Sequence, residues 1–131
     1  MIATAEPPLA PGVNRIVLTA APVDLSATRR ALRDRLRTGG LTPTVVRGVE
    51  QVVTELLGAV FEHPGADSAD VIVTCYRLIV SVRVRSRRPV DLDDGPFGIR
   101  ERLVGSNAFA WGRRERSDGT VELWAEVARE R

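Results

Sequence analysis

The chain has 131 residues, which is long enough to bury one hydrophobic core but not two. Its hydrophobic fraction of 44% and charged fraction of 27% are those of an ordinary globular protein, and no apolar run is long enough to cross a membrane. The formal net charge is only +2 and aromatic residues make up 5%. This disfavours a nucleic-acid-binding protein, because such proteins combine a basic face with aromatic side chains.

The start of the chain lacks the basic and apolar regions of a secretory signal peptide, so we expect a cytoplasmic protein. Residues 1–12 are rich in proline and poor in apolar residues, which predicts a flexible tail before a single domain over residues 13–131. The one cysteine, Cys75, lies in an apolar run and is expected to be a small buried hydrophobic residue.

A strand and then a helix are predicted at the start of the domain. Residues 15–20 alternate weakly between polar and apolar side chains, which indicates a strand. Asp24 or Ser26 can cap a helix that runs to about Thr38, and the glycine pair that follows favours a left-handed stop.

A longer helix is predicted over residues 43–63, with Thr42 as its cap and Pro64-Gly65 at its end. Its apolar residues recur at steps of three and four and form one wide stripe: Val45, Val46, Val49, Val52, Val53, Leu56, Leu57, Val60 and Phe61. Such a stripe must be covered, so we expect this helix to lie on a sheet.

The remaining strands come in two pairs. Residues 71–76 and 78–85 are β-branched runs that predict a tight antiparallel hairpin turning near Arg77. Residues 108–114 and 120–127 predict a second pair, and one or two helical turns are possible over residues 99–104. The order of elements indicates an α+β protein, a two-layer α/β sandwich with the helices on one face of a mixed, mostly antiparallel sheet.

Two groups of side chains on these strands have a simple structural interpretation. The basic cluster consists of Arg83, Arg85, Arg87 and Arg88, and its arginines alternate with valines. This pattern favours the solvated side of a strand over a nucleic-acid-binding face. Trp111 and Trp124 lie on the paired last strands and are expected to be packing partners rather than a binding platform.

Three stretches resemble, in the same order, the ATP-binding domain of the GHKL superfamily, which gyrase, histidine kinases and anti-sigma serine kinases share. Residues 22–41 (PVDLSATRRALRDRLRTGGL) resemble the opening of small stand-alone actinobacterial anti-sigma-type domains. Residues 52–65 (VVTELLGAVFEHPG) resemble their N box, and residues 98–127 resemble the last glycine box and closing hairpin of sensor kinases. The resemblance implies a Bergerat-type sandwich with a site for magnesium and ATP.

The resemblance also assigns roles within the N box. Glu55 matches a glutamate that active relatives are proposed to use as a general base, although a surface glutamate is the simpler interpretation. His63 matches a histidine at the helix end, where an imidazole can also satisfy the last carbonyls. Ala59 stands where relatives have the asparagine that holds magnesium, and a methyl group cannot ligate that ion.

Among the other positions implied by the resemblance, the adenine acceptor and the glycine boxes are altered, whereas the threonine is kept. Ser86 or a neighbouring arginine replaces the aspartate that accepts a hydrogen bond from adenine. Asp94, Gly95 and Gly98 are the remnants of the glycine boxes, with Asp94-Gly95 a possible displaced adenine box. Thr120 matches a threonine that helps to bind adenine, and is also a good strand former.

We interpret the chain as a domain with this fold and a degenerate nucleotide site, for which no cofactor is expected. One hypothesis is a regulatory protein–protein interaction module of the anti-sigma or partner-switching type, whose partner is a sigma factor or an anti-anti-sigma-like protein. The second is an active ATP-dependent serine/threonine kinase that uses magnesium. The third is a structural dimerisation subunit of an active homologue, and a homodimer is also compatible with the exposed edge of the first strand.

Overall fold

The structure is a computed structural model that describes residues 14–63, 65–89, 102–103 and 105–129. Its elements are β1 (Asn14–Ala20), a 3₁₀ turn (Pro22–Asp24), α1 (Leu25–Thr38), α2 (Pro43–Phe61), β2 (Ala69–Cys75), β3 (Ile79–Ser86), β4 (Ala108–Glu115) and β5 (Val121–Ala128). Each of these helices and strands lies close to its predicted range. The predicted tail over residues 1–12 and most of the helical turn over 99–104 lie outside the described residues, but Arg102 and Leu103 are helical.

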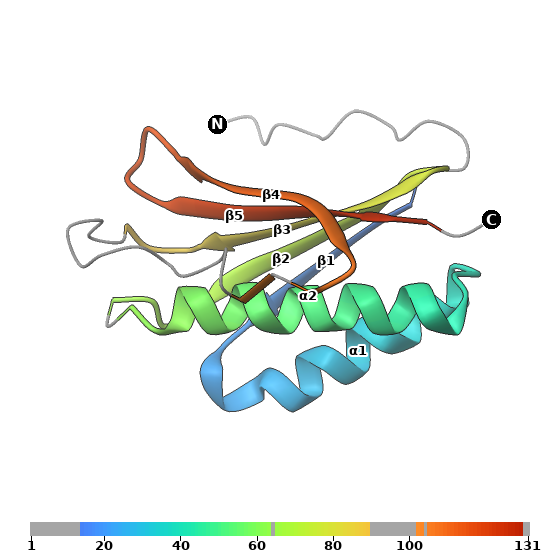
Figure 1. Cartoon of the computed structure of the whole chain (residues 1–131). Coiled ribbons are helices and arrows are strands. Elements are labelled where there is room, and N and C mark those ends of the chain that lie inside the picture. Colours follow the sequence, from blue (N-terminus) through green and yellow to red (C-terminus); the bar gives the residue numbers. More distant parts are fainter. Residues whose placement is uncertain (1–13, 64, 90–101, 104, 130–131) are drawn as a thin grey trace, which may run out of the picture.

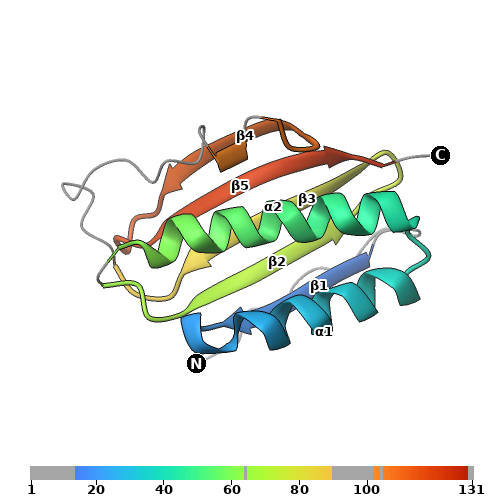
Figure 2. The same ribbon diagram turned by 60° about the horizontal axis from the view of Figure 1, so that its bottom comes forward.

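The five strands form one sheet in the order β1-β2-β3-β5-β4. The sequence predicts a mixed, mostly antiparallel sheet, and in the described strands every neighbouring pair is antiparallel. Both helices cover the same face of this sheet, and none of the described residues forms a helix on its other face (Figures 1 and 2). The predicted two-layer α+β sandwich is therefore confirmed.

The core lies between α2 and the three central strands. The inward residues of α2 are fully buried: Val49, Val52, Val53, Leu56, Leu57 and Val60. They lie against the alternate buried residues of the sheet, which are Val71, Val73, Val80, Val82, Val84, Leu123 and Ala125. The hydroxyl of Thr42 accepts a hydrogen bond from the Val45 N–H at 3.3 Å, so the predicted cap of α2 is present.

Helix α1 ends as its sequence predicts. Gly40 has a φ of +83°, and its N–H donates to the Arg37 carbonyl at 3.0 Å. The Leu41 N–H donates to the Leu36 carbonyl at 3.4 Å, and both leucine side chains are buried. These two bonds and the apolar pair form a Schellman motif, which needs a residue that tolerates positive φ at Gly40.

The start of α1 differs from the prediction. Neither Asp24 nor Ser26 caps the helix with its side chain: Asp24 precedes the first helical residue but makes no side-chain cap bond, and Ser26 lies inside the helix. The reason is the 3₁₀ turn, in which the Asp24 N–H donates to the Ala21 carbonyl at 3.0 Å. This turn holds Asp24 away from the extended conformation that an N-cap requires.

Trp111 and Trp124 are not packing partners of each other. Trp111 pairs with Ala125 across β4 and β5, whereas Trp124 pairs with Gly112. Adjacent residues of a strand point to opposite faces, so Trp111 packs against the core and Trp124 lies on the face without helices.

Among the described residues, no helix combines the length and apolar content that a membrane span requires.

Candidate functional site

The described residues that the resemblance assigns to a nucleotide site lie at one end of the sandwich. Glu55, Ala59 and His63 belong to the C-terminal part of α2 and the turn after it, while Ser86 ends β3 and Thr120 precedes β5. These segments meet at the same end of the sheet (Figures 1 and 2). The other three predicted residues, Asp94, Gly95 and Gly98, lie outside the described part of the chain.

Arg102 occupies the outer face of α2 at this end. Its guanidinium forms an ion pair with Glu62 and another with Glu55, the latter at 3.6 Å between Nη1 and Oε2. Gly58 lies between the two glutamates, and a Cβ added there would meet Arg102 Nη1 at 2.8 Å. The missing side chain at Gly58 therefore lets the guanidinium approach the helix closely.

The sequence interpretation does not identify Arg102 as a functional residue. Gly58 was the available signal, because glycine in a helix interior is unfavourable unless close packing requires it. Ala59, which the helical spacing places near the face of Glu55 and Glu62, is fully buried in the core. The alanine is thus a core residue here, while Arg102 contacts the two glutamates on the outer face.

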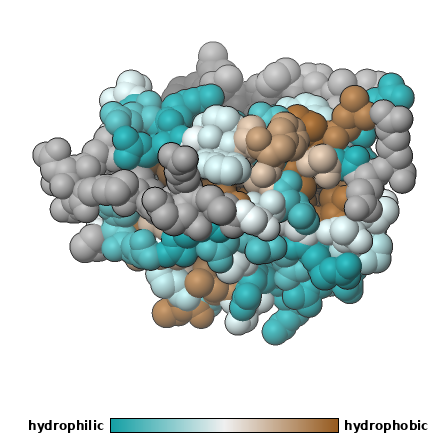
Figure 3. Space-filling model, viewed as in Figure 1, coloured by the Kyte–Doolittle hydropathy of each residue, from teal (hydrophilic) through white to brown (hydrophobic). Residues whose placement is uncertain are grey.

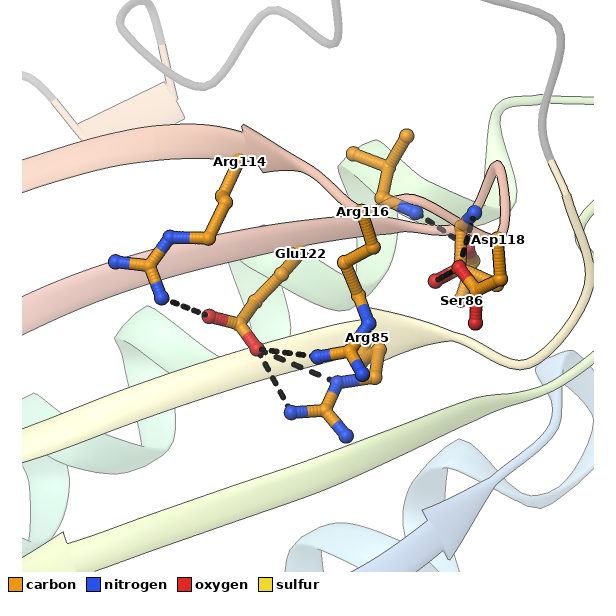
Figure 4. A network of polar contacts seen from close by, with 8 residues as sticks. Arg85, Ser86, Arg114, Arg116, Asp118 and Glu122 are labelled. Atoms are coloured by element: carbon orange, nitrogen blue, oxygen red, sulfur yellow. Dashed lines mark hydrogen bonds and ion pairs between the residues drawn. The ribbon is translucent and has the colours of Figure 1, made fainter.

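The hydroxyl groups of Ser86 and Thr120 are both bonded within the chain. Ser86 is 1% exposed, and its Oγ accepts the Val121 N–H at 3.0 Å. The Thr120 hydroxyl and N–H both donate to Oδ1 of Asp118, at 2.6 and 2.9 Å (Figure 4). These bonds to Thr120 lower the pKa of the Asp118 carboxyl below its usual value.

His63 is 5% exposed and belongs to the turn that follows α2. Its backbone N–H donates to the Val60 carbonyl at 3.1 Å, and its own carbonyl accepts the Ala66 N–H at 3.0 Å. The residue is therefore built into the turn between α2 and β2, as well as lying at the helix end where the resemblance places it.

The described residues of this set do not fit a magnesium–ATP group. Ala59 supplies no oxygen, the carboxylates of Glu55 and Glu62 bind Arg102, and the Ser86 and Thr120 hydroxyls have partners in the chain. Within the described ranges, no three His, Cys, Asp or Glu side chains gather closely enough to hold a metal ion.

Most of the basic cluster, which spans β3 and the two residues after it, is engaged in ion pairs. Arg87 lies 3.6 Å from Asp70, Arg88 lies 3.5 Å from Asp67, and Arg85 forms two hydrogen bonds with Glu122. Arg83 is half-buried on the face of the sheet without helices. This agrees with the predicted solvated side of a strand.

A comparison of the chain with protein-family models finds no match, and a comparison with curated proteins also finds none. The resemblance to GHKL domains therefore stays a prediction from the sequence, and the function is argued below from the geometry of the described residues.

Proposed function

We propose that this chain is a regulatory protein-binding domain with a GHKL-type arrangement and a degenerate nucleotide site, of the anti-sigma or partner-switching type. The observation that supports it best is the position of Arg102. Its guanidinium is paired with Glu55 and Glu62 across Gly58, on the helix that would have to face the ATP phosphates. A cation built into the chain therefore engages both carboxylates at this end of the helix, while Ala59 offers no metal ligand.

The adenine end supports the same proposal. An incoming base would have to displace the Val121 N–H from Ser86 or Asp118 from Thr120 before it could use either hydroxyl. Losing a hydrogen bond to a charged group costs about 1.5–3 kcal/mol, and each 1.4 kcal/mol is about tenfold in affinity. The missing magnesium ligand and the missing adenine acceptor together weaken ATP binding by about two to four orders of magnitude.

Titration calorimetry with ATP, with and without magnesium, tests the nucleotide part of the proposal. We expect very weak binding that magnesium does not improve. Arg102→Ala frees both glutamates but adds no metal ligand at Ala59, so it is also expected to leave ATP binding weak. Arg30→Ala on the exposed side of α1 is the matched control. Tight magnesium-dependent binding by the unmodified chain, with phosphate transfer to a protein serine, would establish the kinase hypothesis instead.

Capture experiments in the native host test the protein-binding part. The tagged full-length chain is expected to retain one stoichiometric protein partner, identified by mass spectrometry as a sigma factor or an anti-anti-sigma-like protein. Reconstitution of that complex from purified components, in the absence of ATP, should give the same stoichiometry. Retention of an active GHKL homologue instead would favour the hypothesis of a dimerisation subunit, and a chain that binds no protein would refute the proposal.

A further inference from the structure

The face of the sheet without helices carries a groove that no part of the proposed nucleotide site uses. It is a cavity of ≈ 210 Å³ lined by Ser81, Arg83, Arg114, Glu122, Trp124 and Glu126. These residues come from β3, β4 and β5, which are neighbours in the sheet. In the space-filling view, hydrophobic residues gather around the β4 side of the molecule, and hydrophilic residues cover much of the helical layer below, apart from a hydrophobic patch at its lower edge (Figure 3).

Glu122 is a buried carboxylate surrounded by three guanidiniums. Its side chain is 1% exposed, and the register of the sheet places it directly opposite both Arg85 and Arg114. Glu122 Oε2 accepts hydrogen bonds from Arg85 at 3.0 and 3.3 Å and lies 4.0 Å from Arg116, while Oε1 lies 3.5 Å from Arg114 (Figure 4). A buried charge needs such partners, because desolvation without them costs several kcal/mol.

The same cluster leaves positive charge available to a ligand. One carboxylate is shared by three guanidiniums, so the group carries an excess of two positive charges (three minus one). Arg114 is 66% exposed and Arg116 is 37% exposed, so each is held by Glu122 on one side and open to solvent on another. The buried carboxylate thus fixes basic groups in place before any ligand arrives, which lowers the entropy cost of binding.

Trp124 forms the apolar part of the groove. It pairs with Arg83 on one side and Gly112 on the other. A Cβ added at Gly112 would lie 2.7 Å from the indole Cζ2, so the ring lies directly over the β4 backbone. Arg83 forms no ion pair with any other described residue, which leaves its guanidinium for a ligand that packs on Trp124.

We infer that this groove binds an extended acidic segment of the partner protein, an inference that rests on the proposed function for the protein nature of that partner. Two arginines and two glutamates line the groove itself, and the excess of two positive charges comes from Arg85 and Arg116, which pair with Glu122 beside it. Guanidinium groups match carboxylates in a planar, two-bonded geometry.

Features of the groove also indicate the pattern of that segment. In the bound segment, carboxylates pair with Arg83 and Arg114, and an apolar or aromatic residue packs on Trp124. A basic or neutral residue of the segment lies beside Glu126. Single-stranded nucleic acid fits less well, because successive bases need several stacking side chains and Trp124 is the one aromatic residue among the described residues that line the groove.

Fluorescence anisotropy with the full-length chain tests this inference. The probe is a fluorescein-labelled peptide in which glutamates alternate around a central phenylalanine and a lysine follows. We expect saturable binding that weakens as salt is raised, and a loss of about tenfold or more in affinity for the double variant Arg83→Ala/Arg114→Ala. Arg30→Ala/Arg37→Ala on α1 removes the same charge from exposed positions and should leave binding almost unchanged.

Two further variants separate a defined groove from general charge attraction. Arg83→Lys/Arg114→Lys keeps the charge but loses the planar geometry, so an intermediate affinity is expected. Trp124→Phe should remove the change in tryptophan fluorescence that accompanies peptide binding at Trp124. The melting temperature of each variant is expected to match that of the wild type, because Arg85 and Arg116 still pair with Glu122.

Several results would overturn the inference. Equal losses in the groove variant and the α1 variant would mean non-specific attraction, and tighter binding of oligothymidylate at the same arginines would mean a nucleic-acid surface. Concentration-dependent self-association that the groove variant abolishes would mean that the groove binds a second copy of this chain. If the natural partner still binds the groove variant with full affinity, the inference fails while the proposed function stands. Tight magnesium-dependent ATP binding would instead refute the degenerate nucleotide site of the proposed function, and would leave peptide binding in the groove as measured.

Discussion

The contact between Gly112 and Trp124 allows a quantitative test of the structure. A Cβ at position 112 would lie 2.7, 2.8 and 2.9 Å from three indole atoms, much closer than carbon atoms normally approach. Gly112→Ala therefore forces the half-buried indole to move. Overpacking of this kind lowers the free energy of unfolding by about 1–3 kcal/mol. Replacing a strand glycine with alanine raises it by about 0.5–1 kcal/mol, because alanine loses less conformational entropy on folding.

The net effect depends on whether the indole is present. In the wild-type background, Gly112→Ala is expected to destabilise the domain by about 0.5–2 kcal/mol, which lowers the melting temperature by about 2–8 °C. In a Trp124→Ala background the collision is gone, and the same change is expected to stabilise by about 0.5–1 kcal/mol. The sign of the effect therefore reverses across a double-mutant cycle.

Denaturant unfolding of the four proteins in this cycle measures the coupling directly. Equal slopes of the unfolding curves are needed for the comparison to hold. Gly65→Ala serves as the control substitution, because a Cβ added at Gly65 meets nothing within 4 Å. If Gly112→Ala had the same effect with and without the indole, the placement of Trp124 over β4, and with it the shape of the groove, would be wrong.

Further predictions concern the core, the basic face, the thiol and the β4–β5 turn. Val53→Asp should unfold the domain, because a fully buried carboxylate without a partner costs several kcal/mol, while Arg83→Ala should leave the melting temperature almost unchanged. Burial raises the pKa of the Cys75 thiol, so a thiol reagent at mildly alkaline pH should modify the folded chain much more slowly than the chain in denaturant. The folded-state pKa of Asp118 is lowered by Thr120, so its contribution to stability is present above the unfolded value of about 3.9 and is lost as the pH falls through the folded value. The stability difference between the wild type and Asp118→Asn should therefore shrink in strong acid, and a difference that grew there would contradict this assignment.

Much of the fold could be predicted from the sequence because its signals are local. The valine and leucine stripe of α2 has the period of a helix, and the alternation of valine and arginine in β3 has the period of a strand. The glycine pair after α1 and the cap at Thr42 are equally local, since each acts on backbone groups a few residues away. The capping of α1 was mispredicted because a 3₁₀ turn, which has no such pattern, competes with it.

The candidate site could be predicted only in part. The sequence by itself determined that position 59 offers no oxygen to a metal ion, since Ala59 has none wherever it lies. Tertiary structure decided what the two glutamates contact: Arg102 meets Glu55 and Glu62 from a segment about forty residues away, as the separation of 40 between Arg102 and Glu62 shows. The burial of Glu122 among Arg85, Arg114 and Arg116 likewise depends on strand order and register, with β5 lying between β3 and β4. Such contacts follow from how whole elements pack together, and no spacing along the chain encodes them.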